Sequence, residues 1–567
     1  MPTIDISLSD LESLVGVKLP RELDKLNEVL SFIKAGAEPA EPGSIESLRV
    51  ELRDGNRPDL WSVEGMAMNL RNFLGIGRGS GYVISGSSGT TVNVDRRLRN
   101  IRPFICCSVV KGVKLTDNTI RGLMQLQEKL DETYGRKRRR TSIGLYDYDL
   151  ISPPLTYGVS RPDESSFIPL GFTEKMTMGE ILERHPKGLE YGELVRRHPV
   201  WPLLYDSRRN ILSFPPIINS NDLGRITEDT KNILVEVTGT SHETVSNTLN
   251  IVTLSLAERG GRVYSVRVKY PYGERRNVVT PILKPSKIEI SLDETNGLLG
   301  LSLSCKEVAK LLKRAGFRIL KVGRASILVE VPFYRIDVMH PVDVMEDVAI
   351  AYGVNSMLPR WPSIVTIGAI DPLEKFKDLV RELMVGFGFQ EILTYVLTNK
   401  DELFSKMNLG VQDVIEVANP RIATFNCLRS WLLPSLMTFL GHNTHVSYPQ
   451  RVFEVGYCVL PDRRMMNGSR DVLKMACASI GPNANFNEMK SVLQSLLLNL
   501  SCPYGLEEAS HPSFIDGRCG RVFVGKEEVG IIGEIHPIVL EAFGLSEPAT
   551  ALELELSEKL IGSAKAG

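Results

Sequence analysis

The sequence predicts an α+β protein built from several domains. It has 567 residues, whereas one soluble domain usually runs to roughly 100 to 200 residues. Short apolar runs typical of buried strands alternate with stretches of helical periodicity, and no solenoid period or low-complexity tract interrupts them. The hydrophobic share of 43% and the charged share of 24% are ordinary for globular protein. We therefore expect more than one hydrophobic core.

Charge and hydropathy narrow the class of protein. The formal net charge of -1 excludes a global basic field, so any nucleic acid must bind a local patch. No apolar stretch reaches the ~18 residues of a membrane-spanning helix. The first segment carries Asp5, Asp10 and Glu12 where a signal peptide would be basic. We expect a cytoplasmic protein that does not associate with membranes.

Two residue types that often mark cofactor sites predict none here. The eight cysteines include no Cys-x-x-Cys pair and no histidines at zinc spacing, which indicates free, buried thiols. The glycines at 75, 77, 79 and 81 follow a helical pattern and miss the Gly-x-Gly-x-x-Gly register of a dinucleotide-binding loop. They predict a flexible linker.

The elements of the first half can be placed in order. The turn-rich segment 54–59 precedes a helix whose apolar positions, from Val63 to Leu74, recur at helical spacing. Beyond the glycine linker, the apolar runs 104–110 and 233–237 are short enough to be buried strands. These segments predict a second, α+β domain.

A small third domain follows from about residue 280. A strand at 288–290 precedes Ser304 and Glu307, which form a capping box ahead of a helix that stops at Gly316. A strand at 327–331 comes next, and Pro341 opens a helix that ends at Gly353. The proline-containing stretch 358–362 predicts a linker, and a helix with Phe376 on its apolar face begins the last domain.

Four carboxylates in the third domain are candidate metal ligands. Asp343, Glu346 and Asp347 share a helical face, and Asp337 precedes that helix, so we expect all four to converge. Oxygen ligands of this kind suit Mg²⁺. Acids in the first turn of a helix also offset its dipole, and Arg335 could neutralise one of them. From the residues alone, the metal site and this structural interpretation are equally supported.

Segments along the whole chain resemble one family. Residues 54–71, DGNRPDLWSVEGMAMNLR, are similar to the turn and helix of phenylalanyl-tRNA synthetase β subunits of the archaeal/eukaryotic cytosolic type. Further matching segments are GRKRRRTSIGLYDYD at 135–149, ILSFPPIINS at 211–220, VEVTGTS at 235–241, YRIDVMHPVDVMEDVAIAYG at 334–353 and GEIHPIVLEAFGL at 533–545. Asp131 and Tyr146 depart from the family pattern that we expect, and no role is assigned to either.

The resemblance implies a fold for each part of the chain. The expected domains are an N-terminal structural domain at 1–90, an α+β B3/B4-type editing domain at 91–270, a small winged-helix-like B5-type domain at 271–358, and a C-terminal antiparallel-sheet domain at 359–567. The last is expected to be class II aminoacyl-tRNA synthetase-like but catalytically inactive, because no glycine-rich segment ending in an ATP-binding arginine is found. Arg429 and Arg451 are interpreted as ordinary ion-paired or solvated residues.

The resemblance also implies partners and a cofactor. The family forms an α2β2 heterotetramer in which the α subunit binds ATP, phenylalanine and the acceptor end of tRNA(Phe), so this chain would support charging without activating an amino acid itself. The positions of Asp337, Asp343, Glu346 and Asp347 match magnesium ligands at the contact with the α subunit. The resemblance therefore favours Mg²⁺ over the structural interpretation of these carboxylates.

A second, hydrolytic site is implied in the editing domain. An apolar pocket rejects an isostere with an added hydroxyl by only ~10²-fold, so charging with tyrosine needs correction. The positions that match the family's editing pocket are Leu204, Ser213, Asn219, Glu236 and Thr238. Glu236 would accept a hydrogen bond from the tyrosine hydroxyl or from the α-ammonium. Ser213, Asn219 and Thr238 would orient water and the ester carbonyl.

Other interpretations of these residues remain open. Without the family, Ser213 and Asn219 are better explained as partners of the backbone in a proline-rich loop, and Thr238 as an ordinary strand residue. The basic run 136–140 is a candidate contact with the tRNA backbone, although such runs are usually solvated loops. The alternative functions are a tRNA-binding scaffold subunit that does not edit and an unrelated nucleic-acid-binding protein, which the near-neutral charge disfavours.

Overall fold

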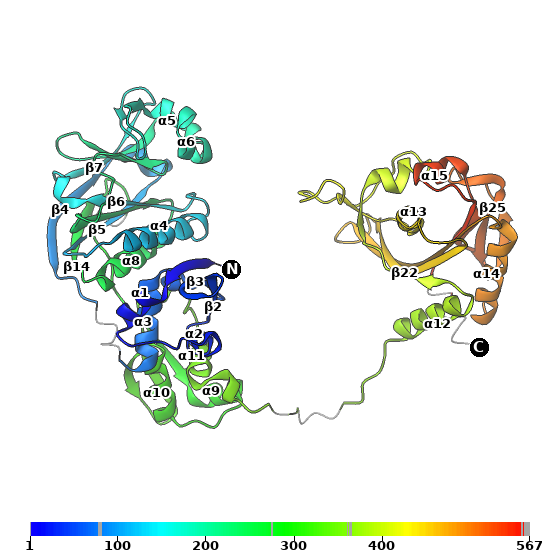
Figure 1. The fold of residues 1–567 in the computed structure, drawn as a ribbon, viewed down its shortest axis with the longest axis horizontal. Coiled ribbons are helices and arrows are strands. Elements are labelled where there is room, and N and C mark those ends of the chain that lie inside the picture. The colour runs from blue at the N-terminus through cyan, green and yellow to red at the C-terminus, as the bar shows by residue number, and fades with distance from the viewer. Residues whose placement is uncertain are drawn as a thin grey trace. The chain divides into compact units, whose positions relative to one another are not determined.

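The computed structural model describes residues 2–76, 82–273, 276–359, 361, 366–556 and 560. Gly77, Gly79 and Gly81 of the predicted linker lie outside the described residues, as do Arg360 and Pro362 of the second one. The chain divides into two compact units, Met1–Trp361 and Pro362–Gly567, each of which is described by itself (Figure 1).

The first unit begins with a three-stranded antiparallel sheet in the order β1-β3-β2. Its elements are β1 (Thr3–Ser7), α1 (Leu8–Val15), α2 (Leu23–Ser31), β2 (Ala35–Glu41) and β3 (Ser44–Leu52). The predicted helix is α3 (Val63–Leu74), and the Ser62 side chain caps it by accepting from the Gly65 amide. A Cβ atom at Gly65 would lie 1.7 Å from the Asp59 carbonyl oxygen, so the turn and the helix can meet only at a glycine.

A ten-stranded sheet forms the centre of the first unit. Its main path runs β12-β11-β10-β7-β4-β14-β5-β13-β6, with β15 paired to β14. The strands are β4 (Gly86–Val94), β5 (Phe104–Lys111), β6 (Thr141–Asp147), β7 (Leu155–Ser160), β10 (Trp201–Tyr205), β11 (Ile211–Phe214), β12 (Ile218–Asn219), β13 (Asn232–Gly239), β14 (Arg262–Lys269) and β15 (Asn277–Thr280). The strands predicted at 104–110 and 233–237 are confirmed as β5 and β13, and the sheet continues to Thr280.

Alternation along β13 separates a hydrophobic core from the candidate site. Ile233, Val235 and Val237 pack in one core with helices α4 (Asp117–Glu132) and α8 (His242–Glu258), which lie against the sheet in Figure 1. Glu236 therefore lies on the other face, because successive strand residues point to opposite faces. A small subdomain completes this region with β8 (Ser166–Phe167), β9 (Met176–Thr177), α5 (Met178–Arg184), α6 (Pro186–Tyr191) and α7 (Glu193–Arg196).

The third region has its own sheet, in the order β16-β18-β17. Its elements are β16 (Ser286–Ser291), α9 (Leu292–Leu299), α10 (Cys305–Arg314), β17 (Arg318–Val322), β18 (Ser326–Val331) and α11 (Pro341–Tyr352). The predicted capping box is confirmed, since Ser304 accepts from the Glu307 amide while Glu307 accepts from the Ser304 amide. The predicted helix at Pro341 is α11, and it ends at Gly353.

The second unit is built on a seven-stranded sheet in the order β19-β22-β23-β27-β26-β25-β24. All neighbours are antiparallel except the short β19, which pairs parallel to β22. Its strands are β19 (Gln390–Glu391), β22 (Gln450–Pro461), β23 (Ser469–Ile480), β24 (Gly505–Glu508), β25 (Phe514–Val524), β26 (Glu527–Ile535) and β27 (Ala549–Glu555). The helices are α12 (Pro372–Gly386), α13 (Leu433–His442), α14 (Phe486–Asn499) and α15 (Pro537–Ala542), and β20 (Leu397–Thr398) pairs with β21 (Cys427–Leu428).

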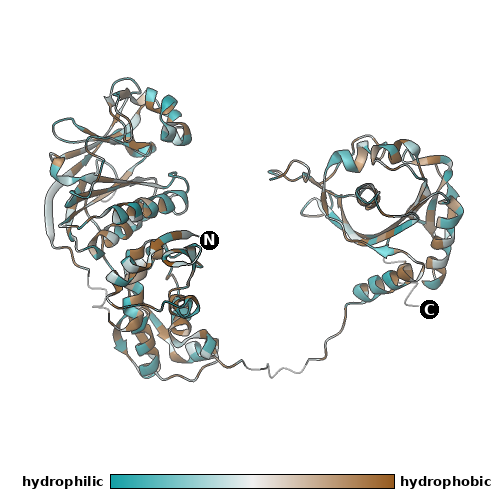
Figure 2. Cartoon of the chain, viewed as in Figure 1, coloured by the Kyte–Doolittle hydropathy of each residue, from teal (hydrophilic) through white to brown (hydrophobic). Residues whose placement is uncertain are grey.

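Arg429 and Arg451, which are expected to be ion-paired or solvated, are both engaged in ion pairs. Arg429 is buried and its guanidinium lies 2.8 Å from the Glu454 carboxylate, while Arg451 lies 2.6 Å from Glu488. All eight cysteines are free and buried, as predicted. Within the described ranges, no helix is long and apolar enough to cross a membrane. Figure 2 shows hydrophobic and hydrophilic residues interleaved along the helices, as expected where one face of a helix is buried.

Candidate functional site

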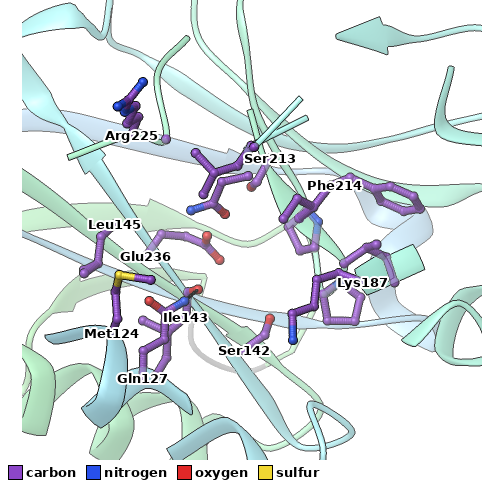
Figure 3. Close-up of a pocket in the computed structure, with 18 of the residues that line it drawn as sticks. Met124, Gln127, Ser142, Ile143, Leu145, Lys187, Ser213, Phe214, Arg225 and Glu236 are labelled. Carbon is purple, nitrogen blue, oxygen red and sulfur yellow. Dashed lines mark hydrogen bonds between the residues drawn. The ribbon is translucent and has the colours of Figure 1, made fainter. Parts of the chain in front are cut away.

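A cavity of about 570 Å³ lies in the first unit, between the two ends of the large sheet. Ser142 of β6 belongs to the last strand of the sheet order, whereas Ser213 of β11 and Asn219 of β12 belong to the first strands, yet all three line this cavity. The sheet must therefore curl until its ends approach each other. Helix α4 contributes Met124 to the wall, and Glu236 reaches in from β13 among these elements (Figure 3).

The hairpin of β11 and β12 sets the positions of two predicted residues. Ser213 pairs with Asn219 across the two strands, and the Pro215-Pro216 peptide bond in the tight connection is cis. Ser213 is also paired with Leu204 of β10. Leu204 is fully buried and is not among the residues that line the cavity. The hairpin thus presents Ser213 and Asn219 to the cavity, with Leu204 behind them.

Glu236 is the central polar group of the pocket. Its side chain is 2% exposed, and its Oε2 accepts a hydrogen bond of 2.8 Å from the Tyr146 hydroxyl. Its Oε1 and the Ser213 Oγ are buried without a hydrogen bond of acceptable geometry to any described residue. Burial raises the pKa of Glu236 to about 7, although the hydrogen bond from Tyr146 and the charge of Arg102 oppose that rise. The pocket therefore holds an acceptor that has no partner within the described chain.

A buried charge network lies beneath the pocket. The Arg102 guanidinium donates to the Thr238 Oγ1 at 2.9 Å and to the Ser142 Oγ at 3.0 Å. Arg138 lies 2.9 Å from the Asp131 carboxylate and also donates to the carbonyl oxygens of Pro216 and Ile217, in the loop that lines the cavity. Burial raises the pKa of Asp131 to about 7. Through these contacts, Arg102 holds Ser142 and Arg138 holds the loop between β11 and β12.

Three of the five predicted pocket residues line the cavity: Ser213, Asn219 and Glu236. Thr238 lies two residues after Glu236 on β13. Its hydroxyl accepts a hydrogen bond from Arg102, so it belongs to the buried network around Arg102 and not to the cavity wall. Within the predicted basic run, Arg138 points inward, whereas Arg136, Lys137, Arg139 and Arg140 are exposed.

The residues that the sequence did not indicate are Tyr146, Arg102 and the wall of α4. The alternation of Ser142, Gly144 and Tyr146 on one face of β6 was a visible signal. It could be interpreted only once β6 was known to pair with β13. That pairing depends on tertiary contacts, which the local sequence does not show.

Contrary to the prediction, the four candidate metal ligands do not converge. Asp337 and Asp347 both accept from the Arg335 guanidinium, at 2.9 and 2.6 Å, and Arg335 is buried between them. Asp343 accepts from the His340 amide as part of the α11 cap, and Glu346 lies 2.8 Å from the Lys34 ammonium. In the described part of the chain, no group of three or more acidic, histidine or cysteine side chains is arranged to hold a metal ion.

The physical reason for this correction is that a guanidinium already supplies the positive charge. Arg57 of the turn at 54–59 adds to it, 3.7 Å from Asp337. With Asp337 and Asp347 so paired, the residues as arranged do not fit a four-carboxylate Mg²⁺ site. Magnesium binding stays a prediction, and it requires Asp337 and Asp347 to exchange Arg335 for the ion.

Comparison with known proteins gives matches along the whole chain. Residues 288–354 match the tRNA synthetase B5 domain, and residues 357–556 match the phenylalanyl tRNA synthetase beta chain CLM domain. The phenylalanine–tRNA ligase beta subunit of Pyrococcus furiosus is 43% identical over 98% of this chain and 99% of its own length. That of Thermococcus kodakarensis is 41% identical over the same shares.

A solved structure matches part of the chain. The crystal structure of an N-terminal fragment of the phenylalanyl-tRNA synthetase beta subunit from Pyrococcus horikoshii is 40% identical, with a TM-score of 0.59. It is covered over 100% of its length and spans 62% of this chain. The fold and the domain matches define a component of an aminoacyl-tRNA synthetase. More specifically, the chain belongs to the family of phenylalanine–tRNA ligase beta subunits.

Proposed function

We propose that this chain is the proofreading subunit of a phenylalanine–tRNA ligase and that the pocket around Glu236 hydrolyses Tyr-tRNA(Phe). The observation that carries the proposal is the buried Oε1 of Glu236, which has no partner within the described chain and lines a cavity large enough for an amino acid. Leaving a buried acceptor without a partner costs about 1 to 3 kcal/mol. A ligand that donates a hydrogen bond there recovers that free energy.

The depth of Glu236 favours the tyrosine hydroxyl over the α-ammonium as its ligand. In an aminoacyl ester the ammonium is adjacent to the carbonyl and hence to the tRNA, which must remain near the mouth. The phenolic hydroxyl is the atom farthest from the tRNA. Because Glu236 is almost completely buried, it is placed to meet that far end. Phenylalanine has no hydroxyl and would leave the acceptor unpaired.

The remaining polar groups suit ester hydrolysis. Water attacks the ester carbonyl carbon, the bond from that carbon to the ribose oxygen breaks, and the ribose oxygen takes up a proton as the free tRNA leaves. The Ser213 hydroxyl, which makes no hydrogen bond of acceptable geometry in the described chain, and the Asn219 amide lie on the hairpin wall, where they can orient the water and donate to the developing oxyanion. An aminoacyl ester is already activated, so no strong nucleophile is needed.

Positive side chains at the pocket suit an RNA backbone. Lys187 and the exposed Arg225 are among the residues that line the cavity (Figure 3). Arg138 of the basic run points inward, and its neighbours in the sequence, Arg136, Lys137 and Arg139, are exposed. Each phosphate contact would add a salt-dependent increment to affinity. We propose that these residues guide the acceptor end of tRNA(Phe).

We further propose an α-subunit partner, in an α2β2 complex, that binds ATP and phenylalanine. In the second unit, large apolar side chains are exposed beside the β20–β21 pair: Leu393 is 89% exposed, Tyr395 78% and Ile422 59%. Patches of this kind usually mark protein interfaces. The proposal expects Ile422→Glu to reduce co-purification with the α subunit, whereas Met466→Glu, at an exposed position in the β22–β23 connection, should not.

Magnesium belongs to the same proposal for the assembled complex, with Asp337, Asp343, Glu346 and Asp347 as ligands. What supports it is that Asp337 and Asp347 already lie within hydrogen-bond distance of one cation, the Arg335 guanidinium. The structural interpretation, in which these acids serve Arg335 and the α11 cap, requires no ion.

The proofreading proposal is tested with the chain co-expressed with its α subunit. The complex should deacylate Tyr-tRNA(Phe), and Glu236→Ala should lose that activity while charging with phenylalanine continues. Glu193→Ala, at an exposed position of α7, is the matched control and should behave like the parent. If Glu236→Ala deacylates Tyr-tRNA(Phe) at the parent rate, the pocket assignment fails. If the parent complex does not deacylate at all, the chain is a non-editing scaffold subunit.

A further inference from the structure

We propose that Tyr146 is a positioning residue of this pocket: its hydroxyl occupies one oxygen of Glu236 and leaves the other free to accept from a hydroxylated side chain. This inference rests on the proposed proofreading function. It assigns the discrimination between tyrosine and phenylalanine to a pair of residues, Tyr146 and Glu236, rather than to the carboxylate alone.

The strand register brings the pair together. In the antiparallel pairing of β6 with β13, Gly144 lies opposite Glu236 and Tyr146 lies opposite Leu234. Gly144 and Tyr146 are two residues apart and share a face of the sheet. A Cβ atom at Gly144 would lie 2.2 Å from the Tyr146 hydroxyl oxygen and 2.6 Å from the Glu236 Oε2. The phenol thus reaches back over a glycine to the carboxylate, and any side chain at 144 would part them.

The single phenolic proton determines which oxygen remains free. The Tyr146 hydroxyl lies 2.8 Å from the Glu236 Oε2 and 3.4 Å from the Asn219 Oδ1, so the proton is used mainly on the carboxylate. Oε1 keeps no partner in the described chain. Because Tyr146 is completely buried and is absent from the cavity lining, it acts on a ligand through lining residues that its hydroxyl meets: Glu236 at 2.8 Å and, more weakly, Asn219 at 3.4 Å.

The same hydrogen bond acts on the charge of Glu236. Burial favours the neutral acid, whereas the bond from Tyr146 and the charge of Arg102 favour the carboxylate. Other titratable groups that act on this site are Asp131 of α4, Cys107 of β5 and Tyr157 of β7. The charged side chains that line the same cavity are Glu128, Arg138, Lys187 and Arg225. Burial raises the pKa of Cys107, Tyr157 and Tyr146 far above neutrality, so these three stay uncharged at neutral pH. Without the Tyr146 hydroxyl, a larger fraction of Glu236 is protonated at a given pH.

The test compares Tyr146→Phe with Tyr270→Phe in the co-expressed complex. Tyr270 is also a buried phenol in the same hydrophobic core, but its hydroxyl bonds to the Ile105 backbone. Tyr146→Phe should lower kcat/KM for Tyr-tRNA(Phe) deacylation by roughly 10- to 100-fold, the effect of one hydrogen bond to a charged group. The rate ratio between Tyr-tRNA(Phe) and Phe-tRNA(Phe) should fall by a similar factor.

The pH profile separates positioning from structural damage. For Tyr146→Phe, the acid limb of Tyr-tRNA(Phe) deacylation, corrected for spontaneous ester hydrolysis, should move up by about one pH unit. Tyr270→Phe should keep the parent limb. Should Tyr146→Phe keep the parent limb and selectivity while Glu236→Ala is inactive, the inference is wrong and the proposed function stands. If the parent complex does not deacylate Tyr-tRNA(Phe), the proposed function itself fails.

Discussion

Replacing Glu236 by glutamine should stabilise the first unit and impair proofreading at the same time. The pKa of this carboxyl rises from its ordinary 4.5 to about 7 because the group is buried. Each pKa unit corresponds to about 1.4 kcal/mol. At pH 8 the unfolded chain has lost this proton at little cost, whereas the folded chain must hold a buried carboxylate. The folded state is therefore penalised by about 3 kcal/mol relative to a chain with an uncharged residue.

The sign of the pH dependence follows from the same values. A folded-state pKa above the unfolded value gives stability that is complete below about pH 4.5 and is lost as the pH rises through about 7. The neutral isostere does not titrate. The gain from Glu236→Gln should thus be about 3 kcal/mol at pH 8 and about 2 kcal/mol smaller at pH 5.5.

The assay is urea unfolding at the two pH values, followed by hydrogen exchange of peptides that cover β13, so that the second unit does not contribute. In parallel, the co-expressed complex is assayed for Tyr-tRNA(Phe) deacylation, in which loss of a charge-assisted hydrogen bond should reduce kcat/KM by about tenfold or more. Glu193→Gln, an exposed control, should change neither quantity. A destabilised Glu236→Gln protein, or a stability gain that is equal at both pH values, would refute the reasoning.

Three further predictions follow from particular contacts. Gly144→Ala should reduce Tyr-tRNA(Phe) deacylation at least tenfold, because the added Cβ would separate Tyr146 from Glu236. Gly122→Ala on α4, where the added Cβ meets open space, should not reduce it, and equal activities of the two variants would contradict the geometry. Arg335→Met should lower the free energy of unfolding by about 3 to 5 kcal/mol in urea titrations, because the buried Asp347 would lose its ion pair and Asp337 would keep only Arg57, 3.7 Å away; a change below about 1 kcal/mol would show that Arg335 does not stabilise α11. The isolated chain should bind Mg²⁺ only at millimolar concentrations in calorimetric titrations, because Arg335 occupies Asp337 and Asp347; micromolar binding would show that the ion displaces the arginine.

Local sequence patterns predicted helix starts and strand positions where a single local signal marks them. The capping box at Ser304 and the proline at 341 marked helices α10 and α11 at their observed starts. The apolar runs gave β5 and β13 to within a residue or two. These features depend on neighbours in the chain, and the sequence shows such neighbours directly.

The candidate site was only partly predictable, because it joins segments that are far apart in the sequence. Ser213, Asn219 and Glu236 were found through a family resemblance, whereas Tyr146 became visible only in the register of β6 against β13. Asp343, Glu346 and Asp347 lie on α11 and Asp337 precedes it, as predicted, but the four side chains do not converge. The direction of each side chain is set by Arg335 and Lys34, whose positions helical spacing does not give.

The central claim is that hydrolysis of mischarged tRNA takes place in the Glu236 pocket. The most direct measurement is the amount of Tyr-tRNA(Phe) that accumulates when the co-expressed complex is given tyrosine, ATP and tRNA(Phe). The account predicts almost none with the parent chain and steady accumulation with Glu236→Ala. Equal accumulation by the two complexes would contradict it.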